Sequence, residues 1–150
     1  MNKTMRLSLF LSLLLLSACG GKQSSIKMGE TTRADVIAEK GEPLSEEDLS
    51  KEATAAPDSS IMNFENGEKI QLKGDIVTNR FTNPTGDKKL VMWWKHKFKE
   101  CIGLKQTKLA HDIKAHTPPE IELTCPSEGL SIIFTEGSDV VSRVVENEKK

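Results

Sequence analysis

The three cysteines are the residues with the clearest chemistry in this sequence, and their spacing limits what they can do. Cys19 ends an apolar run, whereas Cys101 and Cys125 lie in the C-terminal half. The chain has no CxxC pair, the spacing that thiol redox catalysts commonly use. If Cys19 is used otherwise, two thiols remain, and two thiols in an oxidising compartment commonly pair. We therefore predict a disulfide between Cys101 and Cys125, with a pair of buried free thiols as the alternative.

The histidines and the candidate nucleophiles lack the spacing of a reaction centre. His96, His111 and His116 form no HExxH pair, and His111 and His116 are five residues apart, a poor match to one helical face. The chain has no GxSxG motif, no phosphate-binding glycine loop and no evident nucleophile–base pair. We predict no catalytic residue, no metal site and no cofactor. An enzyme is the alternative, which a deep pocket with a perturbed acid or base would favour.

Trp93 and Trp94 are the one concentration of aromatic residues in a chain without tyrosine. Adjacent side chains point to different faces in a helix or a strand, so Trp94 fits a core and Trp93 is turned towards solvent. Lysines flank the pair, at Lys89, Lys95 and Lys97. Three interpretations remain open: Trp93 fills the core or an edge, it binds a protein partner with Lys95 and Lys97, or it contacts a membrane surface.

The first 18 residues have the composition of a cleaved export signal. Lys3 and Arg6 give a positive start, and residues 7–16 form an apolar run. This run is too short to span a bilayer, which needs about 20 residues. A short buried helix is the alternative, disfavoured because the run has no polar face.

The end of the run, Leu16-Ser17-Ala18-Cys19, resembles the box at which bacterial lipoproteins are cut and lipidated. The resemblance implies a diacylglyceryl group on the Cys19 sulfur and an acyl chain, such as palmitate, on its amine. Two or three acyl chains hold a protein firmly at a membrane. Gly20 stands where enteric inner-membrane lipoproteins carry aspartate, which favours the outer membrane, facing the periplasm. An ordinary secretory signal with an incidental cysteine is the alternative.

Charge is unevenly distributed along the predicted mature chain. Removing residues 1–18 leaves 150 − 18 = 132 residues with 19 basic and 22 acidic side chains, which excludes a generic nucleic-acid binder. Residues 30–68 hold eleven acidic against three basic side chains, whereas residues 87–114 hold three acidic against eight basic. We expect an acidic end and a basic end, either as a solvated dipole or as a docking surface.

The N-terminal half is predicted to contain two short helices and then three strands. Thr32 and Asp35 have the spacing of a capping box, and Gly41 and Pro43 end that helix. Ser45 is expected to cap a second short helix. From residue 61 apolar and polar residues alternate, as in antiparallel strands. The turns between these strands are Asn66-Gly67 and Gly74-Asp75.

The C-terminal half is predicted to repeat this order. Asp87 is expected to cap a helix that ends at Gly103, and a strand over residues 90–98 is the rival. The apolar face of this helix would consist of Val91, Trp94, Phe98, Cys101 and Ile102. Strands are expected over residues 120–124, 130–135 and 139–146.

The two halves can be laid over each other with small insertions, Gly67 on Gly129 and Gly74 on Gly137. We therefore predict an α+β fold in which two short helices and a three-stranded antiparallel meander occur twice. The predicted segments are the signal peptide (1–18), the lipidated cysteine and tether (19–26), the first repeat (27–84) and the second repeat (85–150).

The pattern Thr32-x3-Val36-x4-Gly41-x-Pro43 resembles the opening helix of the SmpA/OmlA lipoproteins, also called BamE-like, small components of outer-membrane assembly. The resemblance implies two short helices and a three-stranded sheet, and its tandem form is similar to the fold of the β-lactamase inhibitory protein. We expect a non-catalytic, lipid-anchored envelope protein that binds another envelope protein, in outer-membrane protein assembly or envelope maintenance. The alternative is an inhibitor-like or ligand-binding module that faces the periplasm.

Overall fold

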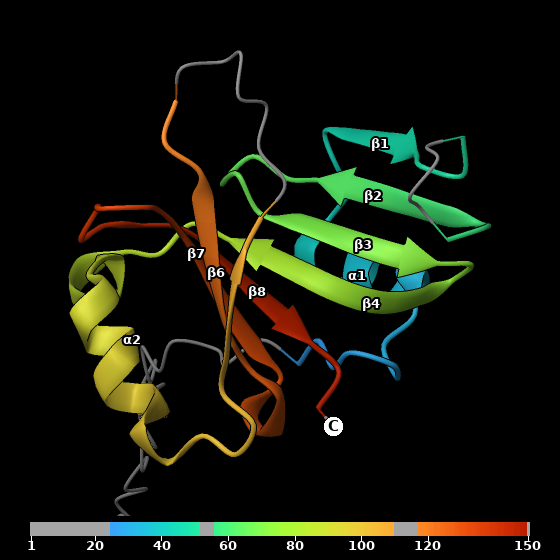
Figure 1. Cartoon of the computed structure of the whole chain (residues 1–150). Helices are drawn as coiled ribbons and strands as arrows, with labels where there is room; N and C mark the ends of the chain where they lie inside the picture. Colours follow the sequence, from blue (N-terminus) through green and yellow to red (C-terminus); the bar gives the residue numbers. More distant parts are fainter. Residues whose placement is uncertain (1–24, 52–55, 110–116, 150) are drawn as a thin grey trace, which may run out of the picture.

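The computed structural model of the chain describes residues 25–51, 56–109 and 117–149. The predictions for the signal peptide, Cys19, His111 and His116 lie outside these ranges. Within them, two α-helices and eight strands are the main elements (Figure 1). They are, in chain order, α1 (Arg33–Lys40), β1 (Ser45–Asp48), β2 (Ser59–Asn63), β3 (Lys69–Lys73), β4 (Ile76–Thr82), α2 (Val91–Lys97), β5 (Lys105–Lys108), β6 (Glu120–Cys125), β7 (Leu130–Thr135) and β8 (Val141–Asn147).

Helix α1 begins and ends where the sequence predicts. The Asp35 N–H donates to Thr32 Oγ1 at 3.3 Å, and the Asp35 carboxylate accepts from the Thr32 N–H at 3.0 Å, which completes the capping box. The hydrogen bond from the Thr32 hydroxyl and that from its N–H hold the pKa of Asp35 below its ordinary value. Gly41, with a φ of 85°, ends the helix.

The residues after α1 form strand β1, not the predicted second helix. β1 pairs antiparallel with β2, with Ser45 opposite Asn63 and Asp48 opposite Ser60. Its sequence, Ser-Glu-Glu-Asp, has no apolar stripe through which a short helix could pack. Pairing with β2 satisfies its backbone groups instead. The prediction that Ser45 caps a helix is therefore wrong.

All eight strands form one antiparallel sheet in the order β1-β2-β3-β4-β8-β7-β6-β5. The last strands of the two halves, β4 and β8, pair in its middle, with Asn79 opposite Asn147. The predicted fold, two short helices and a three-stranded meander occurring twice, is therefore wrong. Each half has one α-helix and four strands, and the pairing of β4 with β8 covers a strand edge that each meander would otherwise expose.

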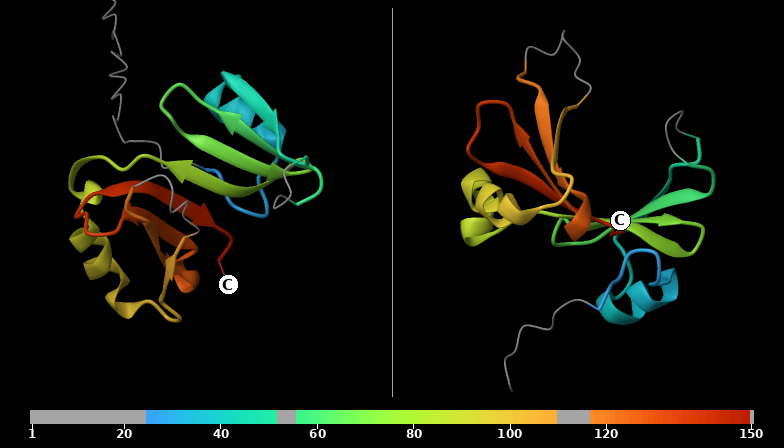
Figure 2. Two further views of the ribbon diagram at one scale, coloured as in Figure 1. Left: turned by 45° about the horizontal axis from the view of Figure 1, so that its top comes forward. Right: turned by 60° about the horizontal axis from the view of Figure 1, so that its bottom comes forward.

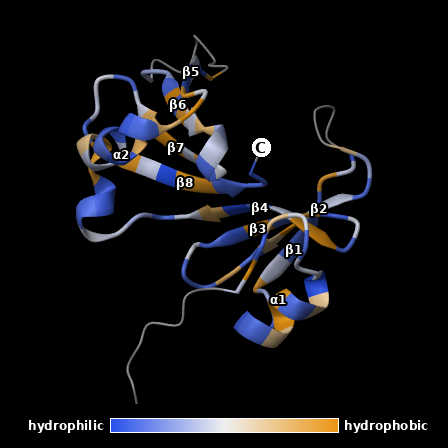
Figure 3. Ribbon diagram, turned by 90° about the horizontal axis from the view of Figure 1, so that it is seen from below, coloured by the Kyte–Doolittle hydropathy of each residue, from blue (hydrophilic) through white to orange (hydrophobic). Residues whose placement is uncertain are grey.

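Both α-helices pack on the same side of the sheet. The sheet bends between its halves, and α1 and α2 lie on the outer side of the bend (Figures 2 and 3). Val36 of α1 packs with buried residues of β2–β4, and Trp94 of α2 packs with buried residues of β6–β8. Hydrophobic burial therefore fixes one helix to each half of the sheet.

The two helices attach to the sheet by equivalent contacts. Thr32, which caps α1, forms a bridge with Ile76, and Leu90, which precedes α2, forms a bridge with Val140. The first N–H of each helix donates to the chain just before β4 or β8: Arg33 N–H to the Asp75 carbonyl at 2.8 Å, and Val91 N–H to the Asp139 carbonyl at 2.9 Å.

The region of α2 agrees with the predicted helix in its core residues but not in its ends. Residues 91–97 are helical, which excludes the rival strand. Leu90 takes the N-cap position rather than Asp87. The helix gives way to a 3-10 turn over Phe98–Glu100, so the predicted apolar face does not continue to Ile102, whose side chain is 80% exposed.

Cys101 and Cys125 are joined in a disulfide between the end of the α2 region and β6. Their Cα atoms are 5.7 Å apart, and 24 residues separate them in sequence. Cys125 is fully buried in the same core as Trp94. The bond therefore holds the exposed loop after α2 against the C-terminal half of the sheet.

Candidate functional site

Trp93 and Trp94 take different positions, as their adjacency predicts. Trp94 is 4% exposed, and its indole N–H donates to the Lys88 carbonyl oxygen at 2.7 Å. Trp93 is half-buried, and its ring meets that of Trp94 edge to face with centroids 4.8 Å apart. The Trp94 ring therefore holds the Trp93 indole at the protein surface in a fixed orientation.

Lysines surround the Trp93 ring. Lys97 Nζ lies 5.7 Å and Lys88 Nζ 6.0 Å from its centroid, both within the range of a cation–π contact. Lys95 is exposed on α2 without such a contact among the described residues. Sequence reasoning missed Lys88, although its place in the Gly-Asp-Lys-Lys turn before α2 could have indicated it. We call the following set the α2 surface: Lys88, Lys89, Trp93, Lys95, Lys97 and Lys99.

Exposed apolar side chains gather around the same helix. Six large hydrophobic side chains are exposed in the described ranges, and five of them flank or belong to the region of α2. Met92 lies on the helix and is 66% exposed. The other four are Leu90, Ile102, Leu104 and Val140. This end of the molecule thus combines basic and apolar groups, a composition suited to contact with another surface.

The second candidate is the side of the sheet opposite the helices, which we call the open face. Residues directly opposite each other in neighbouring strands share a face. Gln71 pairs with Asn79 and Asn79 with Asn147, so their side chains form a polar row across β3, β4 and β8. The Asn147 amide donates to Ser131 Oγ at 3.4 Å, and that hydroxyl donates to Thr124 Oγ1 at 3.0 Å. The row therefore crosses the junction between the two halves.

An apolar strip lies beside the polar row on the open face. Phe81 of β4 is opposite Val145 of β8, and Val145 and Ile133 are both 6% exposed. At the end of this strip is a groove of about 370 Å³ that both halves line. Its charged residues are Lys69, Glu120 and Arg143, and Arg143 Nη2 lies 3.8 Å from a Glu120 carboxylate oxygen. The open face therefore has an apolar centre and a polar margin of both charges.

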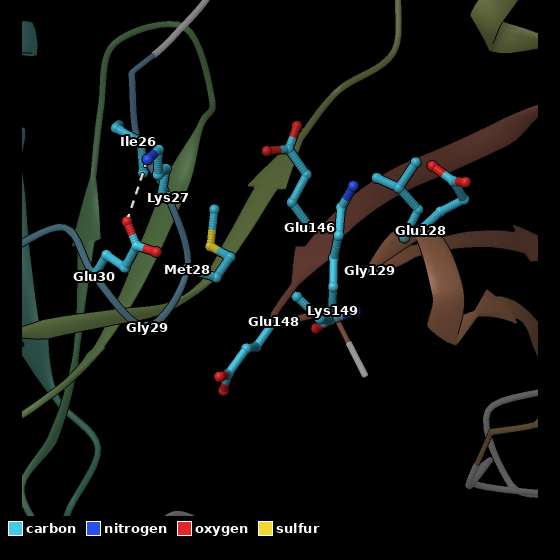
Figure 4. A pocket seen from close by; sticks show the side chains of 12 residues that line it. Ile26, Lys27, Met28, Gly29, Glu30, Glu128, Gly129, Glu146, Glu148 and Lys149 are labelled. Atoms are coloured by element: carbon cyan, nitrogen blue, oxygen red, sulfur yellow. Dashed lines mark hydrogen bonds and ion pairs between the residues drawn. The ribbon is translucent and has the colours of Figure 1, made fainter.

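A cleft of about 680 Å³ separates the segment before α1 from the end of β8 (Figure 4). Lys27 Nζ and a Glu30 carboxylate oxygen form an ion pair across 3.3 Å on one wall. The further charged side chains of the cleft are Glu128, Glu146, Glu148 and Lys149. In the described ranges, no cluster of His, Cys, Asp and Glu has the arrangement of a metal site.

A buried charge network lies on the helix side, near this cleft. Glu68 is 3% exposed and accepts hydrogen bonds from Lys40 Nζ at 2.8 Å and Arg80 Nε at 2.5 Å, while Arg80 Nη1 reaches Glu146 of β8 at 3.4 Å. Burial raises the pKa of Glu68, but the hydrogen bonds from Lys40 and Arg80, the Arg80 charge and a hydrogen bond from Asn66 outweigh it. The pKa therefore lies below its ordinary value. The network ties α1 and both halves of the sheet together.

Comparison with known proteins assigns no family to the chain. No family model, no curated protein and no solved structure matches it. No helix in the part of the chain that the structure describes is both long enough and apolar enough to cross a bilayer.

Proposed function

We propose that the protein is a lipid-anchored, non-catalytic component of the bacterial envelope that binds another envelope protein through the open face. The sequence supports the location: residues 1–18 read as an export signal, and Leu16-Ser17-Ala18-Cys19 resembles a lipidation box. The outer membrane, facing the periplasm, is the proposed site. A role in outer-membrane protein assembly or envelope maintenance follows from the resemblance to the SmpA/OmlA lipoproteins.

The observation that carries the binding proposal is the composition of the open face. Phe81, which is partly exposed, gives it an apolar centre above the buried side chains of Val145 and Ile133, and a row of amide and hydroxyl groups from β3, β4, β6, β7 and β8 lies beside that centre. Protein interfaces combine an apolar centre with a polar margin in this way. Both α-helices pack on the other side, so neither covers this face.

Site-specific crosslinking tests the proposal. A photo-reactive amino acid is placed at Gln71 or Lys69 on the open face of the full-length chain, and at Glu42 just after α1 as the matched control. We expect one envelope protein to be crosslinked from both open-face positions and not from the control. The purified crosslinked protein should then bind the mature lipoprotein, and Phe81→Ala should weaken that binding. Equal crosslinking from all three positions, or unchanged binding by the variant, would contradict the proposal.

The alternative, a ligand-binding module, is favoured by the 680 Å³ cleft. Such a cleft is within the size range of small-molecule sites. It predicts a small molecule that co-purifies with the delipidated protein and that mass spectrometry would detect after denaturation.

A further inference from the structure

We infer that the α2 surface is a docking site for the anionic phospholipid headgroups of the membrane that carries the anchor. The inference rests on the proposed lipid anchor and assigns a partner to Trp93, Lys95 and Lys97. The proposed occupant of the α2 surface is a lipid surface, and vesicle experiments distinguish it from a protein partner.

Charge is the first observation. Residues 86–100 contain five lysines against Asp87 and Glu100, a balance of 5 − 2 = +3, and all five lysines are exposed. None of the ion pairs between described residues includes any of these lysines. Their ammonium groups are therefore available to phosphate groups outside the protein, and each lysine near an anionic membrane strengthens attraction to it.

The second observation is the apolar groups among these lysines. Met92 is 66%, Val140 52% and Leu90 49% exposed. The Trp93 indole is held at the surface beside Lys88 and Lys97. Tryptophan and lysine together suit the headgroup region, where an indole lies between water and acyl chains while an ammonium group meets phosphate. A purely solvated basic surface would not require exposed methionine, leucine and valine.

The third observation is the place of Ile26, near the start of the described chain. Ile26, the second described residue, is buried in the core beneath α1 with Val36 and Met62, on the helix side of the sheet. Seven Cα–Cα steps separate Cys19 from Ile26, a reach of at most about 25 Å at about 3.6 Å a step. A lipid on Cys19 therefore keeps Ile26, which lies on the same side of the sheet as α2, within about 25 Å of the membrane.

The difference in charge between the surroundings of α1 and the α2 surface determines how the molecule tilts on the membrane. Residues 25–42, in and around α1 on the same side of the sheet, hold four acidic side chains (Glu30, Asp35, Glu39 and Glu42) against three basic ones (Lys27, Arg33 and Lys40), a balance of 3 − 4 = −1, and Glu30 is paired with Lys27. An anionic membrane therefore attracts the α2 surface, with a balance of +3, and does not attract the surroundings of α1. The molecule therefore rests on its C-terminal half, and the open face is turned away from the lipid, towards the aqueous space in which a protein partner can reach it.

Tryptophan quenching in vesicles tests this docking. The mature, lipid-anchored protein is placed in phosphatidylethanolamine vesicles, with or without phosphatidylglycerol, whose acyl chains are brominated near the headgroups. We expect quenching of Trp93 with phosphatidylglycerol, and much less without it or in high salt, which screens the lysines. Trp93→Phe should remove the quenched signal and leave the buried Trp94.

Two matched triple variants separate a local site from net charge. The first variant changes three lysines of the α2 surface to glutamine: Lys89, Lys95 and Lys99. The second variant changes three lysines of the open face to glutamine: Lys69, Lys73 and Lys105. One lysine changes affinity for an anionic surface about fivefold, so the first variant should weaken docking about 100-fold. The second should quench like the wild type. The inference would be overturned if both triple variants lost Trp93 quenching equally, or if the wild type were quenched equally in vesicles with and without phosphatidylglycerol.

Two further readouts keep the proposals distinct. Flotation with neutral vesicles reports the lipid anchor alone. A protein without lipid on Cys19 does not float with these vesicles, whether or not its Trp93 fluorescence is quenched by anionic ones. Crosslinking from the open face reports the protein partner alone. If Trp93→Ala abolished binding of the crosslinked protein while phosphatidylglycerol left Trp93 unquenched, the α2 surface would be a protein interface and the lipid inference would be wrong.

Discussion

Replacing Glu68 with glutamine should lower the free energy of unfolding by about 3 kcal/mol at pH 7. The carboxylate accepts charge-assisted hydrogen bonds from Lys40 at 2.8 Å and Arg80 at 2.5 Å. Such bonds contribute roughly 1.5–3 kcal/mol each, and the glutamine amide retains one acceptor oxygen. The Lys40 and Arg80 side chains are only 17% and 16% exposed, so water replaces the lost partner incompletely. Arg80 keeps Glu146, which places the loss near the lower end of the range for broken buried ion pairs, about 3–5 kcal/mol.

The same residue predicts how stability depends on pH. The pKa of Glu68 in the folded protein lies below its ordinary value of 4.5, so folding favours the ionised carboxylate. Its contribution is present in full above about pH 4.5 and is lost as the pH falls through the folded pKa. The stability difference between wild type and Glu68→Gln should therefore shrink in acid, below pH 4.5.

Urea unfolding of the disulfide-bonded protein at pH 7 and in acid measures both effects. Glu148→Gln is the matched control, because it removes one exposed carboxylate from the same side of the molecule and should change stability little. A loss below about 1 kcal/mol for Glu68→Gln would refute the account of this network. A loss that did not decrease in acid would refute the assignment of the effect to ionised Glu68.

Three further changes test local features of the fold. Replacing Cys101 and Cys125 with serine should lower the free energy of unfolding by about 3.5 kcal/mol, because the disulfide closes a loop with a 24-residue separation and so lowers the entropy of the unfolded chain. Urea titration of the wild type and the variant measures this difference, and an unchanged urea midpoint would contradict it. Thr32→Ala removes the cap of α1 and should reduce stability by about 1 kcal/mol in thermal unfolding. Gly129→Ala should reduce it by about 3 kcal/mol, because the new Cβ would lie 2.5 Å from a carbonyl oxygen of β8. Gly74→Ala, with a similar φ and nothing within 4 Å, should lose only about 1 kcal/mol, and equal losses in the two glycine variants would show that the contact is irrelevant.

Elements with strong local signals could be predicted from the sequence. The capping box of Thr32 and Asp35 placed the start of α1, and Gly41 placed its end. Alternating apolar residues and the turns at Gly67 and Gly74 placed β2, β3 and β4. These signals act within a few residues, because a cap or a turn depends on the backbone preferences and hydrogen bonds of its immediate neighbours.

The two candidate surfaces could be predicted only in part from the sequence. The adjacency of Trp93 and Trp94 predicted that one ring is buried and the other turned outward, and the lysines near them were evident. Lys88, however, reaches the Trp93 ring only because the turn before α2 folds back beside the helix. The open face could not be predicted at all, because it depends on pairing between strands that are more than sixty residues apart.

By itself, the sequence determined helix α1, the turns of the N-terminal half and the charge of each half, and it contains the pattern from which we predict an export and lipidation signal. Only the tertiary structure decided that Ser45–Asp48 is an edge strand and that β4 pairs with β8 to make one sheet. The physical reason is that a strand has no internal partner for its backbone groups. Which neighbour satisfies them depends on how the whole chain packs, and that packing also placed both described α-helices on one side of the sheet.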